Sequence, residues 1–351
     1  MAAREGGVAV EGVSAERPRA AERDADRPRS FYRSEEGELR SDLHPRELVE
    51  LARSGKGTLW VDIDTADRHQ HALLELAFRF HPLSIEDTLN PQSRVKVEEY
   101  PEHLFAIVRA VKFCEETEDP YDVETSNLCF FLARNLLVTT HVDRAPAVDA
   151  VMDRVTRSPD LLARGAERLM HAVMDSAVDA YFPILEQLDV FVDGLEERIF
   201  TSFDETAVRD IFSVKRLVLS MRRHLAPQRE VFNVPTNRPT PFLSREAQVY
   251  FRDVYDHMLR INDSLETYRD LLSSTLDSYL SQVSNRLGTA TKGLSLAATL
   301  SVPFVMVSGM WGMNFANIPL AQHPHGFAIM MAIQLGLGVG LVALLRWMRI
   351  L

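Results

Sequence analysis

The chain has 351 residues, and its 50 acidic against 39 basic side chains give a net charge of −11. This length is about twice that of a typical domain, so two or more modules are expected. The acidic balance argues against a nucleic-acid-binding protein, which would need a basic face, and it favours a body that attracts cations. The two cysteines, Cys114 and Cys129, fit a reducing compartment.

The first 40 residues mix charged side chains, alanine and proline with few large apolar side chains. Such a segment cannot bury enough apolar surface to offset the entropy lost on ordering. We therefore expect residues 1–40 to form a disordered tail. The opening MAAREGGVAV also lacks the apolar core of a secretory signal peptide.

Residues 41–165 are predicted to form an α/β domain. Runs rich in β-branched and aromatic residues are the candidate strands, at 58–63, 104–113, 123–133 and 136–142. Apolar residues at helical spacing indicate helices near 45–53, 70–80 and 145–156.

Residues 166–292 have a helical pattern and are predicted to form a helical bundle. Between 169 and 200, apolar residues recur every three to four positions, and Pro183 is expected to kink this helix. A proline-rich stretch at 233–241 is expected to break the helical structure.

One long stalk helix is predicted from about Ser244 to Met310. No glycine or proline occurs between Phe242 and Leu287, and apolar residues recur there at spacings of three and four. A helix of this extent would be roughly 100 Å long at 1.5 Å per residue. Because so long a helix must bury its apolar stripe, we expect a bundle formed partly with neighbouring subunits.

The C-terminal segment, residues 293–351, has the pattern of a transmembrane domain. Two apolar runs, Leu294–Met310 and Phe327–Leu345, contain no Asp, Glu, Lys or Arg, and each is long enough to cross a membrane as a helix. Residues 311–326 form the predicted outer loop between them. A buried hairpin in a soluble protein is the alternative, but two adjacent charge-free runs of this length are rare in soluble domains.

The charges beside the apolar runs predict the orientation. Arg286 and Lys292 precede the first run, and Arg346 and Arg349 follow the second, whereas the connecting loop has no Lys or Arg. Because positive residues favour the cytoplasmic side, we expect both termini in the cytosol and the chain in the cell (inner) membrane.

A short motif, Trp311-Gly312-Met313-Asn314-Phe315, follows the first apolar run. At this point the chain resembles the CorA magnesium-transporter family, whose signature is an aromatic residue followed by Gly-Met-Asn. Segments 81–100, 250–270 and 276–286 also look like segments of that family. The resemblance implies an α+β membrane protein: a cytosolic α/β domain, a long stalk helix continuing into a two-helix transmembrane hairpin, and a homopentamer in the lipid bilayer.

The signature predicts a selectivity filter at Gly312, Met313 and Asn314. A ring of Asn314 amide oxygens could hydrogen-bond the waters of hydrated Mg²⁺, an ion that gives up water reluctantly. A neutral ring also releases its ion more readily than a carboxylate ring, as conduction requires. The alternative role for Asn314 is a helix C-cap in a turn.

Counting back from the signature in helical steps predicts a pore-lining stripe of small, weakly polar residues. Its members are Gly288, Thr291, Leu294, Ala298, Val302, Val305 and Gly309. Ordinary packing between membrane helices explains such spacing equally well. The resemblance implies that this helix lines the pore and that Leu294 matches a hydrophobic gate. The chain departs from the family at Gly288 and Thr291, and its outer loop lacks acidic residues.

The resemblance also implies regulatory Mg²⁺ sites in the cytosolic domain. Asp87 and Asp253 match one site shared between subunits, Glu86, Asp175 and His257 match a second, and Asp277 matches an acidic ring below the pore. Mg²⁺ favours hard oxygen ligands, and an ion that binds the closed state better shifts the channel toward closure. The alternative is that these are solvated surface acids, as most Asp and Glu are.

The function that this pattern indicates is a passive channel for Mg²⁺, and also for Co²⁺ or Ni²⁺, closed by cytosolic Mg²⁺. Two alternatives remain, a zinc transporter of the same superfamily and a non-conducting membrane-anchored scaffold that senses divalent ions. His323 and His325 of the outer loop could bind a soft metal, although loop histidines more often do not. No P-loop, G-x-S-x-G or H-E-x-x-H motif occurs, so an enzyme is not expected.

Overall fold

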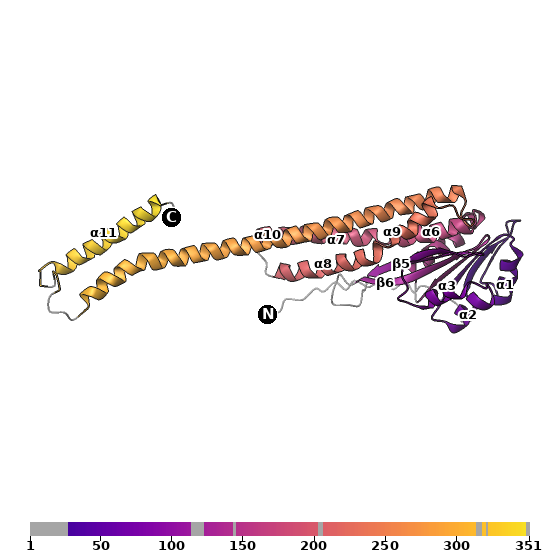
Figure 1. The fold of residues 1–351 in the computed structure, drawn as a ribbon, viewed down its shortest axis with the longest axis horizontal. Coiled ribbons are helices and arrows are strands. Elements are labelled where there is room, and N and C mark those ends of the chain that lie inside the picture. The colour runs from indigo at the N-terminus through magenta and orange to yellow at the C-terminus, as the bar shows by residue number, and fades with distance from the viewer. Residues whose placement is uncertain are drawn as a thin grey trace, which may run out of the picture. The chain divides into compact units, whose positions relative to one another are not determined.

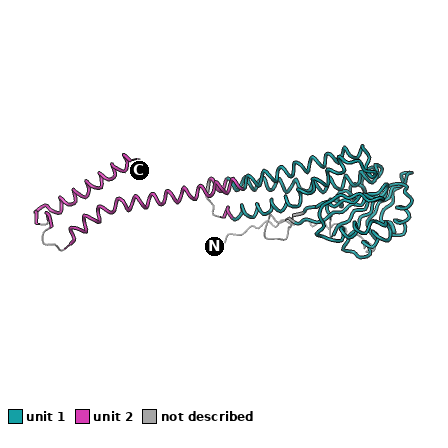
Figure 2. Tube along the Cα trace, in the orientation of Figure 1, with its two compact units in different colours: residues 1–196, 209–272 teal, residues 197–208, 273–351 magenta. Residues whose placement is uncertain are grey.

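A computed structural model of the protein describes residues 27–113, 123–142, 145–202, 206–313, 318–320 and 322–348. The chain divides into two compact units (Figure 2). Unit 1 contains residues 1–196 and 209–272, and unit 2 contains residues 197–208 and 273–351.

Unit 1 is built on a seven-stranded sheet with the strand order β2-β1-β3-β7-β6-β5-β4 (Figure 1). The strands are β1 (Arg29–Arg33), β2 (Leu39–Ser41), β3 (Thr58–Asp64), β4 (Lys96–Glu99), β5 (Leu104–Phe113), β6 (Val123–Leu132) and β7 (Leu136–His141). Among these strands, β3 and β7 pair in parallel, and all other neighbours pair antiparallel. The four strands predicted from the sequence are thus confirmed as β3, β5, β6 and β7.

Helices cover both faces of the sheet, which explains why every residue of β7 is buried. On one face, Leu48 and Leu74 pack with Val61 and Phe131 in a single apolar core. The helices of this side are α1 (Pro45–Ser54), α2 (Arg68–Leu76) and α3 (Pro82–Leu89). The other side has α4 (Pro146–Arg157), α5 (Asp160–Ala163) and α6 (Ala166–Asp179). The predicted helices near 45–53, 70–80 and 145–156 correspond to α1, α2 and α4.

The predicted disordered tail is wrong for residues 29–40, because these residues form β1 and β2. β1 pairs with β2 on one side and with β3 on the other, so both of its edges are hydrogen-bonded. The Phe31 ring lies tilted beside Trp60, with ring centroids 6.2 Å apart, and Tyr32 is buried. These aromatic side chains supply the apolar area that the rest of the N-terminal segment lacks.

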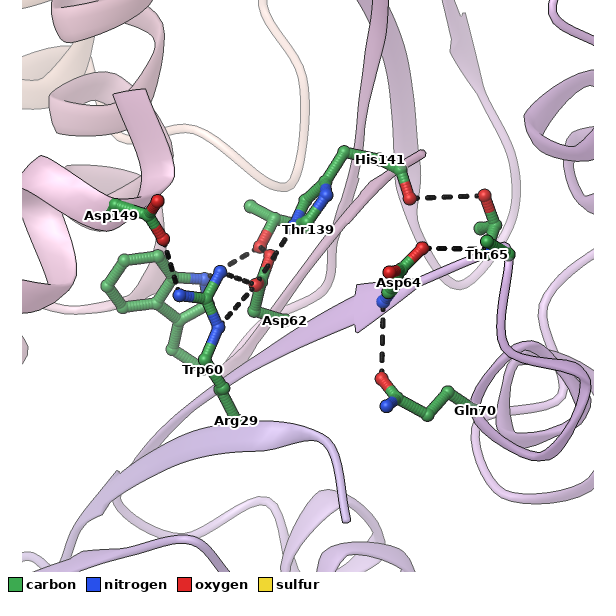
Figure 3. Close-up of polar contacts among 10 residues, drawn as sticks. Arg29, Trp60, Asp62, Asp64, Thr65, Gln70, Thr139, His141 and Asp149 are labelled. Atoms are coloured by element: carbon green, nitrogen blue, oxygen red, sulfur yellow. Dashed lines mark hydrogen bonds and ion pairs between the residues drawn. The ribbon is translucent and has the colours of Figure 1, made fainter. Parts of the chain in front are cut away.

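A buried polar network holds β1 to the sheet (Figure 3). Asp62 accepts hydrogen bonds from Arg29 Nε (3.1 Å) and Thr139 Oγ1 (2.6 Å), and His141 Nε2 lies 3.1 Å away. Arg29 also reaches Asp149 of α4 at 2.5 Å. Burial alone would raise the pKa of Asp62, but hydrogen bonding and charge from His141 and Arg29 outweigh it and keep the pKa below its ordinary value.

Two prolines act differently from the prediction. Pro183 does not kink a continuous helix: α6 ends at Asp179, and Pro183 lies in the first turn of α7 (Phe182–Glu197), where its missing N–H costs little. The expected break at 233–241 is shorter, because α9 (Gln228–Asn237) continues through Pro235. Burial of Val231, Phe232 and Pro235 offsets the lost backbone hydrogen bond.

The predicted long helix is confirmed as α10 (Arg245–Trp311), with 67 residues (Figure 1). Within unit 1, its apolar stripe is buried from Phe251 to Leu272 against the same chain. α7 is followed by the π-helical turn η1 (Arg198–Ser202), and α8 (Thr206–Leu225) precedes α9.

Unit 2 contains the C-terminal part of α10 and the helix α11 (Gly326–Trp347). Both helices are long and apolar enough to cross a membrane. The most apolar part of α10 has no buried residues. The described chain therefore leaves an apolar helix exposed, and exposure of that surface to water is unfavourable.

Candidate ion pathway and metal sites

The predicted pore-lining stripe lies uncovered on α10. Every one of its seven residues is exposed, and the side chain of Leu294 keeps 74 % of its surface. No heavy atom would lie within 4 Å of a Cβ added at Gly288 or Gly309. The stripe is therefore free to face other chains or an axis.

A different face of α10 packs against α11. Gln334 donates hydrogen bonds to Ser308 Oγ (2.7 Å) and to the Phe304 carbonyl (3.3 Å). Gly338 lies so near the Phe304 ring that an added Cβ would come within 2.7 Å of it. At 3.6 residues per turn, Phe304 and Ser308 point away from the centre of the stripe. One face of α10 therefore contacts α11, whereas the stripe is uncovered in the described chain.

The described part of the predicted filter lies directly after α10. The Gly312 N–H donates to the Ser308 carbonyl at 3.0 Å, so Gly312 still continues the helical hydrogen-bonding pattern. Met313 is half exposed. Asn314 lies outside the described residues, and both its filter role and its capping role remain predictions.

Asp277 lies on the same face of α10 as the stripe, because it precedes Gly288 by about three helical turns. Its side chain is exposed, and it makes no ion pair with any residue that the structure describes. An unpaired carboxylate on this face is what the predicted acidic ring requires.

Asp175 and His257 come together with a third residue, Asp179, whose role the sequence analysis missed. We call these three residues the acidic cluster: one ligand atom of each lies within 4.8 Å of the others. His257 Nδ1 lies 3.5 Å from Asp179 Oδ1, and its Nε2 lies 3.9 Å from Asp253 Oδ1. Asp179 follows Asp175 by four positions, and that spacing on a predicted helix could have identified it.

The electrostatics of the acidic cluster favour a cation. Burial raises the pKa of Asp175 above its ordinary value, and repulsion from Asp179 and Asp253 raises it further. His257 Nδ1 is buried and has no hydrogen-bond partner among the described residues. Two carboxylates and an imidazole nitrogen fit a divalent ion, which would relieve both the repulsion and the unpaired nitrogen.

Glu86 and Asp87 lie on α3, in a different pocket, with Lys96, Glu98 and Tyr100. Lys96 Nζ contacts Asp87 at 2.5 Å and Glu98 at 2.9 Å, and Ser93 donates to Asp87 at 3.1 Å. Burial would lower the pKa of Lys96, but its two carboxylate partners outweigh burial and raise it. A positive charge of the same chain therefore already neutralises Asp87.

Within one chain, the structure brings Asp175 and His257 together in the acidic cluster and places Glu86 in a separate pocket, which Lys96 also lines. Asp253 lies beside His257, and its side chain is mostly exposed. The pairing of Asp87 with Asp253 across subunits stays a prediction.

The histidines of the outer loop have a local structural role. His323 Nδ1 accepts a hydrogen bond from the His325 backbone N–H at 3.2 Å. This bond occupies one ring nitrogen in shaping the turn, which favours the loop interpretation over a soft-metal site.

Comparisons with known proteins agree on one family. A family model described as "CorA-like Mg2+ transporter protein" matches residues 55–348. The cobalt/magnesium transport protein CorA of Thermotoga maritima is 31 % identical over 257 residues, covering 73 % of this chain and 72 % of that protein. The CorA of Methanocaldococcus jannaschii is 26 % identical over 291 residues, covering 82 % of this chain and 89 % of that protein.

The fold has a solved counterpart. The complete structure of the CorA magnesium transporter from Methanocaldococcus jannaschii superposes with a TM-score of 0.76 at 22 % identity, covering 91 % of this chain and 97 % of that one. The sheet domain, the long helix and the two apolar C-terminal helices are thus an arrangement already known from that structure.

Proposed function

The chain belongs to the CorA-like Mg²⁺ transporter family, and from this premise we propose that it is a passive channel that carries Mg²⁺ into the cytosol. Members of this family are divalent-cation transporters, so the chain is a transporter and not an enzyme. We extend the proposal to Co²⁺, which the name of the Thermotoga relative includes, and to Ni²⁺.

The channel proposal rests on one observation: two faces of α10 have different surroundings. One face packs against α11, while the stripe from Gly288 to Gly309 is uncovered and has no charged side chain. In a homopentamer, five such stripes would surround one axis, and their apolar rings would close the pore by excluding water. Leu294 is the proposed gate.

We propose that selection occurs at the outer end of the stripe. Asn314, following Gly312 and Met313, would form a ring of neutral amide oxygens that holds a hydrated ion by its waters. The proposal places this ring outside the membrane, both termini in the cytosol, and the chain in the cell membrane.

We propose that cytosolic Mg²⁺ closes the channel by binding carboxylates of unit 1. The acidic cluster, Asp253 and Asp87 would bind Mg²⁺ in the closed state and repel one another when the ion is absent. Glu86 would support the Asp87 site, and Asp277 would concentrate cations below the pore.

The test is ion uptake into liposomes that contain the purified full-length protein. The wild type is compared with Asn314→Ala, with Asn317→Ala as a control in the same loop, under a negative-inside potential and low internal Mg²⁺. We expect wild-type Mg²⁺ entry to be retained in Asn317→Ala and to fall toward the rate of protein-free liposomes in Asn314→Ala.

Other outcomes identify the alternatives. Absence of Mg²⁺ entry in the wild type would refute the channel and favour the divalent-sensing scaffold. Entry of Zn²⁺ in preference to Mg²⁺ would favour the zinc transporter. Equal entry in Asn314→Ala and the wild type would keep the channel but refute the asparagine ring.

A further inference from the structure

A basic pocket of about 360 Å³ lies where α4, α5 and α6 meet in unit 1. We define the basic pocket by Arg154, Arg164, Arg168 and His171, which line it together with Asp160 and Asp175. Three guanidinium groups outnumber two carboxylates, so the pocket is positively charged in a chain whose net charge is −11. A local reversal of the overall charge indicates a specific ligand rather than general solubility.

The arginines of this pocket are not used for ion pairs in the fold. Neither Arg154 nor Arg164 forms an ion pair with a carboxylate among the described residues, and both are exposed. Arg168 stacks on the Tyr250 ring, its guanidinium carbon 3.1 Å from the ring centroid, which holds the group in one orientation. A fixed guanidinium loses little entropy when it binds an anion.

Two residues that line the pocket each have a buried nitrogen atom with no hydrogen-bond partner among the described residues. These atoms are Nη1 of Arg168 and Nε2 of His171. Buried polar atoms are nearly always paired, so an unpaired donor beside a cavity indicates a group that the cavity receives. Burial and the charge of Arg168 together lower the pKa of His171 to about 4, so the ring is neutral at pH 7.

We infer that the basic pocket binds a phosphate-type oxyanion, held by the guanidinium groups of Arg154, Arg164 and Arg168. Planar guanidinium groups recognise phosphoryl oxygens through paired hydrogen bonds, which favours a phosphate over a halide. The volume lies at the small end of ligand pockets, which suits one or two phosphoryl groups. The phosphate could belong to a free inorganic anion or to a nucleotide.

Asp175 connects this pocket to the acidic cluster, because it lines the pocket and belongs to the cluster. A divalent cation on the cluster would offset the negative charge of Asp175 and strengthen anion binding next to it. By thermodynamic linkage, the anion would strengthen cation binding by the same factor. This coupling rests on the proposed Mg²⁺ site, whereas the anion site itself does not.

The experiment is titration calorimetry on the full-length protein in detergent, first in buffer freed of divalent ions by a chelating resin. Inorganic phosphate, pyrophosphate and ATP are the ligands, and adenosine is the phosphate-free comparison. We expect pyrophosphate and ATP to bind and adenosine not to bind. Arg164→Gln and Arg154→Gln should each weaken binding by about tenfold, the usual cost of losing one charge-assisted hydrogen bond.

Arg157→Gln is the matched control, because Arg157 is an exposed arginine of the same helix as Arg154 and does not line the pocket. Its affinity for pyrophosphate should equal that of the wild type. Absence of binding by the wild type at millimolar pyrophosphate and ATP would overturn the inference. The inference would also be overturned if Arg157→Gln and Arg164→Gln lost equal affinity for pyrophosphate. It would be overturned as well if adenosine bound as tightly as ATP. ATP and pyrophosphate binding equally would identify the phosphate chain as the recognised group.

A second titration, with Mg²⁺ present at about 5 mM, tests the coupling between the two sites. Because pyrophosphate itself binds Mg²⁺, inorganic phosphate is the ligand here, and the wild type should bind it more tightly with Mg²⁺ than without. Asp175→Asn should bind inorganic phosphate more tightly than the wild type when no metal is present. An unchanged affinity in both comparisons would refute the coupling. Transport is not measured, so failure of the channel proposal would leave these results interpretable.

Discussion

Lys96 is a single residue whose place in the fold bears on regulation. It contacts Asp87 and Glu98 and is about as buried as Asp87 itself. A divalent ion that binds Asp87 has to compete with this ammonium group. Lys96→Met keeps the aliphatic part of the side chain and removes the charge.

We expect Lys96→Met to be inhibited at lower Mg²⁺ than the wild type. The half-inhibitory concentration in the liposome assay should fall about two- to fivefold, as expected for a partly exposed ion pair worth up to about 1 kcal/mol. Lys56→Met, at an exposed lysine, is the control. An unchanged or higher half-inhibitory concentration in Lys96→Met would contradict the idea that Lys96 competes with the ion.

His103 predicts how the stability of unit 1 depends on pH. Its ring is buried between Phe80 and Tyr100, with centroids 4.8 and 4.9 Å away, and its Nε2 lies 3.3 Å from Ser84 Oγ. Burial and, to a smaller extent, the charge of His81 together lower the pKa of His103 from its ordinary value of 6.5 to about 4. The unfolded chain therefore binds a proton between these two values that the folded chain does not bind.

The folded state should accordingly lose stability as the pH falls from 6.5 toward 4. The melting temperature of the wild type, followed by circular dichroism, should decline over this interval. His103→Phe should reduce the decline, because the titrating group is gone, and His69→Gln, at an exposed histidine, should not. Identical declines in His103→Phe and the wild type would assign the effect to other groups.

At the scale of the element, α10 changes its surroundings along its length. Its apolar stripe is covered by the same chain as far as Leu272, but Val283 is 37 % and Leu287 is 67 % exposed. Leu287 is mostly uncovered by the described chain, and a long isolated helix needs lateral packing. In the proposed channel, this exposed surface would pack against other copies of the chain.

The contact between α10 and α11 has a matched pair of glycines that tests it. Gly338 has the Phe304 ring against it, whereas nothing lies within 4 Å of a Cβ added at Gly336. Gly338→Leu should lower the stability by about 1–3 kcal/mol, the usual cost of overpacking. The melting temperature of the full-length protein in detergent is the measurement.

Gly336→Leu should leave that melting temperature unchanged or raise it, since leucine favours a helix over glycine. If both substitutions lowered it equally, Gly336 would also be covered, by a part of the assembly that a single chain does not contain. If neither lowered it, the packing of Phe304 on Gly338 would not contribute to stability.

At the scale of the whole molecule, two candidate spans per chain are too few to enclose a pore, so the channel proposal requires an oligomer. We expect native mass spectrometry of the detergent-solubilised protein to detect one closed assembly of five copies. A predominantly monomeric protein at micromolar concentration would contradict the proposed pore. A closed ring with another number of copies would keep the pore and correct the stoichiometry.

The sequence by itself determined the parts of this protein that depend on local pattern. Two charge-free apolar runs and an unbroken helical period predict the spans and α10, and β-branched runs predict the central strands, because these signals are properties of neighbouring residues. The motif after α10, together with its place between two apolar runs and with segments 81–100, 250–270 and 276–286, indicated the family, because these signals can be read in sequence order. β1 was not predicted because its ordered structure depends on contacts with Trp60 and Asp62, which lie more than 25 residues away along the chain.

Only the tertiary structure decided which side chains meet. Asp179 joins Asp175 and His257 because α6 and α10 pack together, and Lys96 reaches Asp87 because β4 runs beside α3. The basic pocket likewise forms from three helices whose arginines show no motif in the sequence. Such contacts are set by the packing of distant elements, and a local pattern holds no information about the distances between them.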